Sequence, residues 1–243
     1  YAPCLFPCFI LFEYFIKKTY LRQMLRIVAH IISLLFHPLL MVTYMLVLLL
    51  LINPYLFGVN SVLDRTALIL LVLLSTFVIP GFAVTMMRTL GLVQSIQLKT
   101  RQERIGPYIA TGVFYLWMVR NFWDNPDIPT AYTSFVLGAT LGLFLAFLIN
   151  LFTKISAHAV GMGGLLAMVI ITMWLFSYGT FTVNLGSLGS YEVSMYIVLS
   201  LVILLCGIVG TCRLLLDAHD PKDLYGGYVV GFLSQFIALR FLF

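Results

Sequence analysis

An arginine, a histidine and three aspartates lie within eleven positions of a chain that is otherwise poor in charge: Arg213, Asp217, His219, Asp220 and Asp223. A histidine followed four residues later by a carboxylate can act as a nucleophile or base whose tautomer the carboxylate fixes. A nearby arginine suits a phosphate, because its planar fork of N–H donors matches phosphate oxygens. The elements that carry these side chains decide whether they can act together.

The composition places the chain in a membrane. It is 62% hydrophobic and 9% charged, with a mean hydropathy of +1.06. Crossing a hydrocarbon core takes about 20 apolar residues per helix, and only helices or closed barrels pair every backbone group inside lipid. The apolar runs are continuous rather than alternating, which is the helical pattern. We therefore expect an all-α fold, a polytopic transmembrane helical bundle.

The apolar runs predict about seven spans in one domain. Residues 1–16 are apolar but short and precede a basic stretch, the reverse of a signal peptide. We expect an interfacial or non-native N-terminal segment over 1–26 and a transmembrane domain over 27–243. The polar, uncharged stretch 181–191 is expected to be a loop. The expected spans are 27–52, 66–90, 106–122, 131–152, 157–180, 192–212 and 224–242.

Prolines and glycines inside the spans predict kinks and close packing. Pro38 and Pro80 are expected to bend their helices, and Gly227 and Gly231, four residues apart, are expected to let another helix approach closely. His37 has two interpretations. It is a functional intramembrane histidine, or it satisfies a carbonyl group that Pro38 frees.

Basic and imidazole side chains gather in three loops on one side of the predicted bundle. If the N-terminal side is named face A, the loops after the second, fourth and sixth spans all return to face A. Together these loops can bring seven groups to one depth. The groups are Lys99, Arg101, Arg104, Lys154, His158, Arg213 and His219.

Such a cluster suits the hydrolysis of a phosphate ester. Arginines and a lysine can hold the oxygens, while two histidines can divide the roles of nucleophile and general acid. This chemistry needs no metal and we expect no cofactor, since Asp217, His219 and His158 lack a recognised metal-ligand spacing. Asp220 is also a typical N-cap for the last helix, and Asp223 fits both capping and catalysis.

The third loop resembles the last motif of the type 2 phosphatidic acid phosphatase (PAP2) superfamily. The family's three motifs read K-x6-R-P, then P-S-G-H, then S-R-x5-H-x3-D. Here Cys212 and Arg213 are followed by five residues and His219, then by three residues and Asp223. The spacing is intact, and cysteine stands where the family has serine.

The other two loops resemble the family's first two motifs. The second reads Ile-Ser-Ala-His, which keeps Ser156 and His158 but lacks the proline and glycine. The first keeps Lys99 and Pro107, and the arginine before the proline is missing. Arg104, two residues before that position, is the expected substitute.

The resemblance implies a six-helix core and a role for each matched residue. His219 would attack phosphorus and become a phosphohistidine, Asp223 would fix its tautomer, and His158 would protonate the leaving oxygen. The expected phosphate-binding residues are Lys99, Arg104, Arg213, Ser156 and Arg101. Arg101, Lys154 and Lys222 have an alternative interpretation. They are part of the general excess of positive charge on the cytoplasmic side of membrane proteins and have no role in phosphate binding.

The distribution of basic residues bears on orientation. Face A carries eleven lysines and arginines and face B three, which together make the chain's 14. The positive-inside rule then places face A in the cytoplasm. The resemblance argues for the opposite side, because most members of the family work on the outer face of the bacterial inner membrane or in an organelle lumen.

The expected function is hydrolysis of a phosphate monoester or diphosphate of a lipid by an integral membrane phosphatase of the bacterial inner membrane. The expected partners are the lipid phosphate substrate and membrane lipids, with no nucleic acid. A proton-coupled transporter with a relay through His37, His158, His219 and Asp223 is the alternative from another class. A catalytically inactive relative that binds lipid phosphate is a third interpretation.

Overall fold

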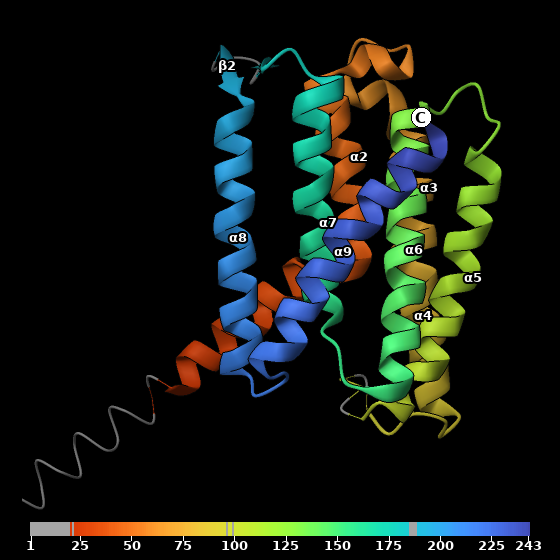
Figure 1. The fold of residues 1–243 in the computed structure, drawn as a ribbon, viewed down its shortest axis with the longest axis vertical. Helices are drawn as coiled ribbons and strands as arrows, with labels where there is room; N and C mark the ends of the chain where they lie inside the picture. Colours follow the sequence, from red (N-terminus) through yellow and green to blue (C-terminus); the bar gives the residue numbers. More distant parts are fainter. Residues whose placement is uncertain (1–19, 21, 96, 99, 185–188) are drawn as a thin grey trace, which may run out of the picture.

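The computed structural model is a bundle of long helices (Figure 1) and describes residues 20, 22–95, 97–98, 100–184 and 189–243. The long helices are the N-terminal helix (residues 22–35), α2 (Met41–Ile52), α3 (Thr66–Leu73), α4 (Ile79–Thr89), α5 (Ile105–Phe122), α6 (Thr130–Phe152), α7 (Ala157–Ile171), α8 (Met195–Leu215) and α9 (Pro221–Leu242). Short 3-10 turns cover Pro38–Leu40, Pro54–Phe57, Val62–Arg65 and Gln102–Arg104. Residues 1–19, expected to be an interfacial segment, lie outside the described residues.

Among the described residues, six helical stretches are long and apolar enough to cross a membrane, which confirms the all-α membrane fold. The expected span over 106–122 is present as α5, which packs against α4 and α6 but is not among the six. Its ends carry polar residues, which lowers its mean hydropathy. The six stretches are Arg22–Ile52, Pro54–Thr89, Thr130–Phe152, Ala157–Phe176, Met195–Leu215 and Pro221–Leu242.

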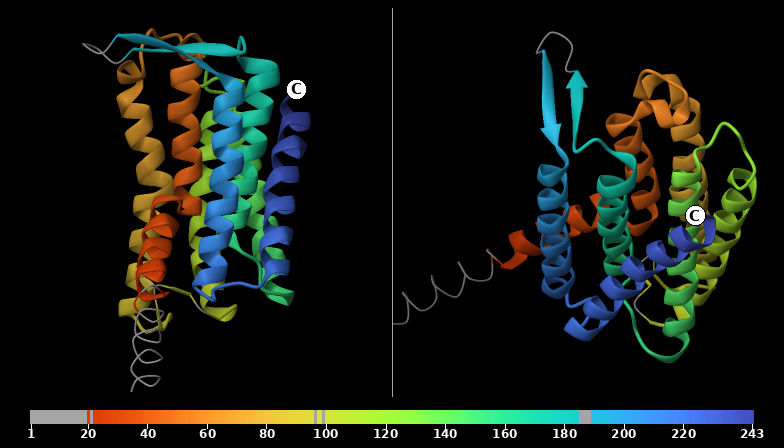
Figure 2. Two further views of the ribbon diagram at one scale, coloured as in Figure 1. Left: turned by 90° about the vertical axis from the view of Figure 1, so that its left-hand side faces the viewer. Right: turned by 45° about the horizontal axis from the view of Figure 1, so that its top comes forward.

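The prediction of a loop over 181–191 is wrong, because most of this stretch belongs to the two strands of an antiparallel hairpin. Strand β1 (Thr180–Asn184) pairs with β2 (Ser190–Ser194) along its whole length. Threonine, valine and aromatic residues alternate here and favour strands, and Phe181 is buried against the core. Figure 2 shows the hairpin at the end of the bundle opposite the N-terminal helix.

Pro38 breaks the first span, as predicted. Proline lacks an N–H and disfavours helical torsions in the residue before it, so His37 is extended, with φ −65° and ψ 136°. The N-terminal helix therefore ends before His37, and the 3-10 turn Pro38–Leu40 leads into α2. The carbonyl groups of the last helical turn are freed, and that of Leu35 accepts a hydrogen bond of 2.6 Å from the Tyr44 hydroxyl.

The region around Pro80 is also irregular. A π-helical turn (Leu74–Val78) joins α3 to α4, and Pro80 lies in the first turn of α4. A second π-helical turn, Thr172–Phe176, follows α7.

Helices α7 and α9 cross in close contact through glycines, as predicted for Gly227 and Gly231. A Cβ on Gly231 would lie 1.9 Å from the carbonyl oxygen of Val160, and one on Gly227 would lie 2.8 Å from that of Ser156. These neighbours are backbone atoms and cannot rotate away. The crossing holds the start of α7, with His158, beside the start of α9, which follows His219.

The connections α4–α5, α6–α7 and α8–α9 all lie at the end of the bundle where the N-terminal helix lies (Figure 1). This is the arrangement predicted from the alternation of spans. The α6–α7 connection rises from this end into the bundle before α7 begins. The first turn of α7 therefore lies within the bundle rather than at its surface.

Candidate functional site

A cavity of about 940 Å³ lies between the helices and is lined by side chains from both halves of the chain. The N-terminal helix, α4, α5, α6, α7, α9 and the α8–α9 connection all contribute. The chain has four histidines, and all four line this cavity. They are His30, His37, His158 and His219.

His219 and Asp223 form a buried pair at the start of α9. His219 Nδ1 lies 3.0 Å from Asp223 Oδ2, and the two side chains are 3% and 12% exposed. A carboxylate only accepts, so Nδ1 carries the proton and Nε2 of the neutral ring keeps its lone pair. The Asp220 N–H also donates to Oδ2, at 3.4 Å, and Asp220 and Asp223 form a capping box. Asp223 therefore both caps α9 and fixes the His219 tautomer.

The surroundings of His219 keep its ring neutral. Burial lowers the pKa of His219 to about 4, against the opposing effect of its hydrogen bond to Asp223. The positive charges of Arg104, Arg213 and Lys154 lower it further. At neutral pH the imidazole is therefore a free base inside a positively charged site, which suits an attack on an anion.

His158 lies in the first turn of α7, and the break at Pro38 orients it. Its Nε2 lies 3.0 Å from the carbonyl oxygen of Ser33. The N-terminal helix ends before His37, so no helical hydrogen bond from His37 occupies that carbonyl, which accepts from His158 instead. A carbonyl only accepts, so Nε2 carries a proton and Nδ1 is the nitrogen left to exchange one.

Two arginines stand near His219 with part of their donors in use. Arg104 Nε donates to the Leu98 carbonyl at 2.9 Å, and Nη1 donates to the Ile155 carbonyl at 3.0 Å. Arg213 Nη1 donates to Ser33 Oγ at 3.4 Å, and its Nε is buried without a partner among the described residues. Both arginines and Lys154 line the cavity. Donors on Arg104 and Arg213 thus remain for an anion.

Two of the expected phosphate-binding residues do not line the cavity, and a third lies outside the described residues. Lys99 lies outside the described residues. Arg101 is exposed and its guanidinium donates to the carbonyl of Phe152, so it does not line the cavity. Ser156 is fully buried and caps α7, its Oγ accepting from the Ala159 N–H at 3.4 Å, and it is not among the lining residues either.

The acidic residues near the cluster fulfil structural roles. Asp217 forms an ion pair of 3.1 Å with Arg26. Glu103 accepts from the backbone N–H groups of Thr100, Gln94 and Ser95. These bonds, the one from Thr100 first, lower the pKa of Glu103.

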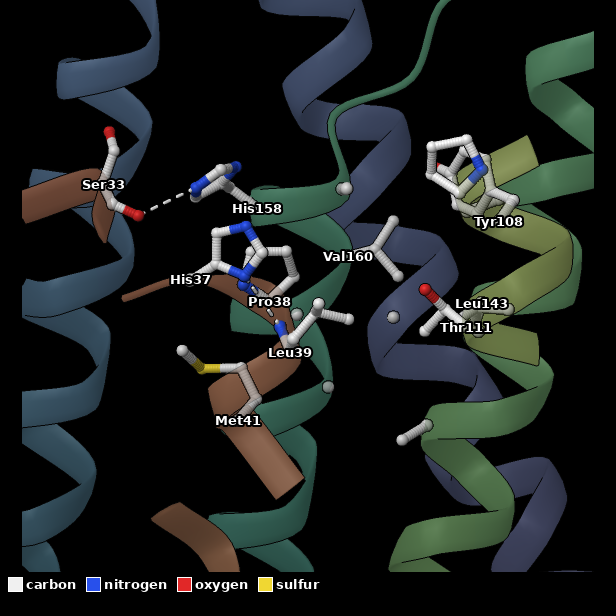
Figure 3. Close-up of a pocket in the computed structure, with 18 of the residues that line it drawn as sticks. Ser33, His37, Pro38, Leu39, Met41, Tyr108, Thr111, Leu143, His158 and Val160 are labelled. Atoms are coloured by element: carbon white, nitrogen blue, oxygen red, sulfur yellow. Dashed lines mark hydrogen bonds between the residues drawn. The ribbon is translucent and has the colours of Figure 1, made fainter. Parts of the chain in front are cut away.

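The sequence motifs missed Ser33 and gave His37 no fixed role. Ser33 uses its carbonyl for His158 and its hydroxyl for Arg213. His37 lies beside His158, with ring centroids 5.5 Å apart, and lines the cavity (Figure 3). The dipeptide His37-Pro38 was the available signal, because proline predicted a freed carbonyl. It could not show which side chain would take that carbonyl.

Away from the histidines most of the lining side chains are apolar, and Ser234 and Gln235 of α9 are polar exceptions. Met41, Val42, Phe77 and other carbon-rich side chains line the cavity. On the facing helix α5, Tyr108 and Thr111 complete the wall (Figure 3). Leu34 also lines the cavity and is 64% exposed, so the space reaches the outside of the bundle beside the N-terminal helix. A charged head and an apolar tail could therefore occupy one continuous space.

A scan against protein-family models finds no match, and searches of curated proteins and solved structures find none either. Among the described residues, no three or more histidine, cysteine, aspartate or glutamate side chains are arranged to hold a metal ion. The fold and the cavity define a polytopic helical membrane protein with a cationic cavity lined by histidines.

Proposed function

We propose that this protein is an integral membrane phosphatase that removes phosphate from a lipid monoester or diphosphate through a phosphohistidine, without a metal. One observation carries the proposal: His219, paired with Asp223, lines a single cavity together with His158, Arg104, Arg213 and Lys154. The resemblance to the type 2 phosphatidic acid phosphatase motifs supports the same chemistry. The apolar continuation of the cavity supports a lipid as the substrate.

In the first step His219 is the nucleophile. Its Nε2 lone pair attacks phosphorus and forms a P–N bond, while Asp223 holds the proton on Nδ1. The bond from phosphorus to the leaving oxygen breaks, and the electron pair stays on that oxygen. His158, protonated at Nδ1, donates a proton to it.

In the second step water replaces the histidine. His158, now neutral, accepts a proton from the water as it attacks phosphorus. The P–N bond breaks and its electron pair returns to Nε2, which releases inorganic phosphate and restores both histidines. Arg104 and Arg213 bind the equatorial oxygens of the phosphoryl group while negative charge develops on these oxygens. Stabilisation of this charge is the main electrostatic contribution to catalysis of phosphoryl transfer.

The proposal includes a location. The balance of eleven basic residues on face A against three on face B favours a site that faces the cytoplasm. The bacterial inner membrane is the proposed membrane. Lipid phosphates would enter with their tails still in the bilayer, since the cavity reaches the lipid-facing surface beside Leu34.

Phosphate release by the purified protein in detergent tests the proposal. Lipid phosphates and diphosphates are incubated with chelator present, and wild type is compared with His219→Ala. We expect release that survives the chelator and vanishes in the variant. Loss of release on chelation would contradict the metal-independent mechanism.

The same assay addresses the alternatives. No release from any lipid, together with lipid phosphate binding that needs Arg213, would indicate an inactive relative. No release and no binding, with proton flux into proteoliposomes that His158→Ala abolishes, would indicate a transporter.

A further inference from the structure

His37 is a second imidazole beside the proposed general acid, and the hydrolysis as described does not use it. Its ring centroid lies 5.5 Å from that of His158, with the planes at 78°. Its Nδ1 accepts from the backbone N–H of Leu39 at 3.4 Å. A backbone N–H only donates, so neutral His37 carries its proton on Nε2 and can donate to a ligand in the cavity.

The three histidines follow one another along the cavity. His219 belongs to the α8–α9 connection at the charged end. His158 lies beside His37, and the start of α7 that carries it contacts the start of α9 after His219, where the Ser156 N–H donates to the Asp223 carbonyl at 3.3 Å. His37 is followed by Leu39 and Met41, which line the apolar part (Figure 3). A ligand with its reacting phosphorus at His219 and its leaving oxygen at His158 therefore has its next group at His37 and its tail beyond.

The position at His37 is polar and positively charged. Arg213 Nη1 donates to the Ser33 hydroxyl at 3.4 Å, and the carbonyl of the same serine accepts from His158, so the guanidinium lies close to the His37–His158 pair. Arg213 Nε is buried without a partner among the described residues. If the apolar tail of a ligand lay beside His37, the N–H groups of His37 Nε2 and Arg213 Nε would have no acceptor. A buried donor without an acceptor costs free energy. An anionic group there would pair with both donors.

We propose that His37 and Arg213 bind the second phosphoryl group of a lipid diphosphate, so that the protein removes the terminal phosphate and leaves a lipid monophosphate. This inference rests on the proposed phosphatase function. His219 Nε2 forms the bond to the terminal phosphorus, and the bond from that phosphorus to the bridging oxygen breaks. His158 protonates the bridging oxygen, and His37 holds the departing lipid monophosphate.

Two substrates with the same tail test the inference, namely farnesyl diphosphate and farnesyl monophosphate. The kcat/KM for phosphate release is measured for both with the purified full chain. We expect kcat/KM of wild type to be roughly 10- to 100-fold higher for the diphosphate than for the monophosphate. This factor corresponds to the free energy that hydrogen bonds to a charged group contribute. In His37→Ala we expect kcat/KM for the diphosphate to fall by that factor, with less than a threefold change for the monophosphate.

Two variants serve as controls. His30→Ala removes another histidine of the cavity wall, one that is exposed, and should leave the preference unchanged. His37→Gln keeps an N–H donor near the position of Nε2 and should restore part of the preference. Each variant is compared with wild type for thermal unfolding in detergent, so that misfolding is recognised.

Equal kcat/KM for the two substrates in wild type would overturn the inference and leave the phosphatase function standing. So would a His37→Ala variant that slows both substrates equally, which would show a general role in positioning His158. Phosphate release from neither substrate nor from any other lipid phosphate would remove the phosphatase function, and this inference with it.

Discussion

One carboxylate oxygen of Asp223 accepts two hydrogen bonds, one from the backbone at the start of α9 and one from a histidine ring. Asp223 Oδ2 accepts from the N–H of Asp220, which completes the start of α9, and from Nδ1 of His219. The start of α9 therefore fixes the orientation of His219, the proposed nucleophile. Capping and catalysis are compatible at Asp223, as the sequence suggested.

Replacing Asp223 by asparagine separates the two roles. We expect Asp223→Asn to lower kcat by on the order of 10³-fold, since the amide no longer enforces the proton on Nδ1. Asp220→Ala is the matched control, because it removes the N-cap without touching His219. It should cost about 1 kcal/mol of stability and little activity per folded molecule. Similar loss of activity in both variants would show that Asp223 acts through the helix end alone.

The protonation of His219 can be measured directly. Burial holds the pKa of His219 at about 4, so the folded ring is neutral above that pH and protonated below it. NMR of protein with labelled histidine should give a titration midpoint near pH 4 for the signal that His219→Asn removes. A midpoint near 6.5, the ordinary value, would mean that the ring is solvated and the site open.

At the scale of the element, the break at Pro38 is what gives His158 its partner. Pro38→Ala should allow the N-terminal helix to continue, so that the N–H of His37 takes the Ser33 carbonyl. We expect kcat to fall roughly 10- to 100-fold, as general-acid catalysis weakens. Pro54→Ala, in the turn at the opposite end of the bundle, should leave kcat unchanged. An unaltered kcat in Pro38→Ala would show that the freed carbonyl does not orient His158.

The crossing of α7 and α9 is the contact on which the site depends. Gly231→Ala should destabilise the protein by about 1–3 kcal/mol, because its Cβ would meet the backbone of Val160. Gly226→Ala, one turn away, places its Cβ in open space and should stabilise α9 by about 0.5–1 kcal/mol. The midpoints of thermal unfolding in detergent distinguish the two. Equal midpoints would mean that the helices can separate without cost.

The elements were predictable to different degrees, for physical reasons. Long apolar runs indicate spans directly, because lipid admits few other structures. The hairpin over 180–194 was missed, since its strands are short and its alternation is interrupted by glycines. The break at His37-Pro38 was predictable from the chemistry of proline, but its use by His158 depends on a contact between residues 125 positions apart.

At the scale of the whole molecule, sequence alternation correctly predicted that three connections meet at one end. It could not separate Arg104 from Arg101, because both lie in the same connection. The difference is tertiary: Arg104 reaches the carbonyl of Ile155 and the cavity, while Arg101 reaches the end of α6. A motif likewise does not show that the Ser156 hydroxyl caps α7 instead of lining the cavity.

The orientation of the whole molecule is testable in cells. In a cysteine-free background, Tyr55→Cys and Lys222→Cys place exposed thiols at opposite ends of the bundle. With the site in the cytoplasm, a membrane-impermeant maleimide added to intact bacteria should label the cysteine at position 55. The cysteine at 222 should react only after the cells are opened. The reverse pattern would place the site on the outer side.

The cavity draws on the N-terminal helix, on α5 and α7 in the middle of the chain, and on the start of α9. During synthesis Ser33 enters the membrane long before His219 and Asp223 leave the ribosome. The side chains of the proposed site thus meet only when α9 packs across α7. If the protein has the proposed activity, a nascent chain should therefore be inactive until α9 is inserted, and the onset of activity should mark the completion of assembly.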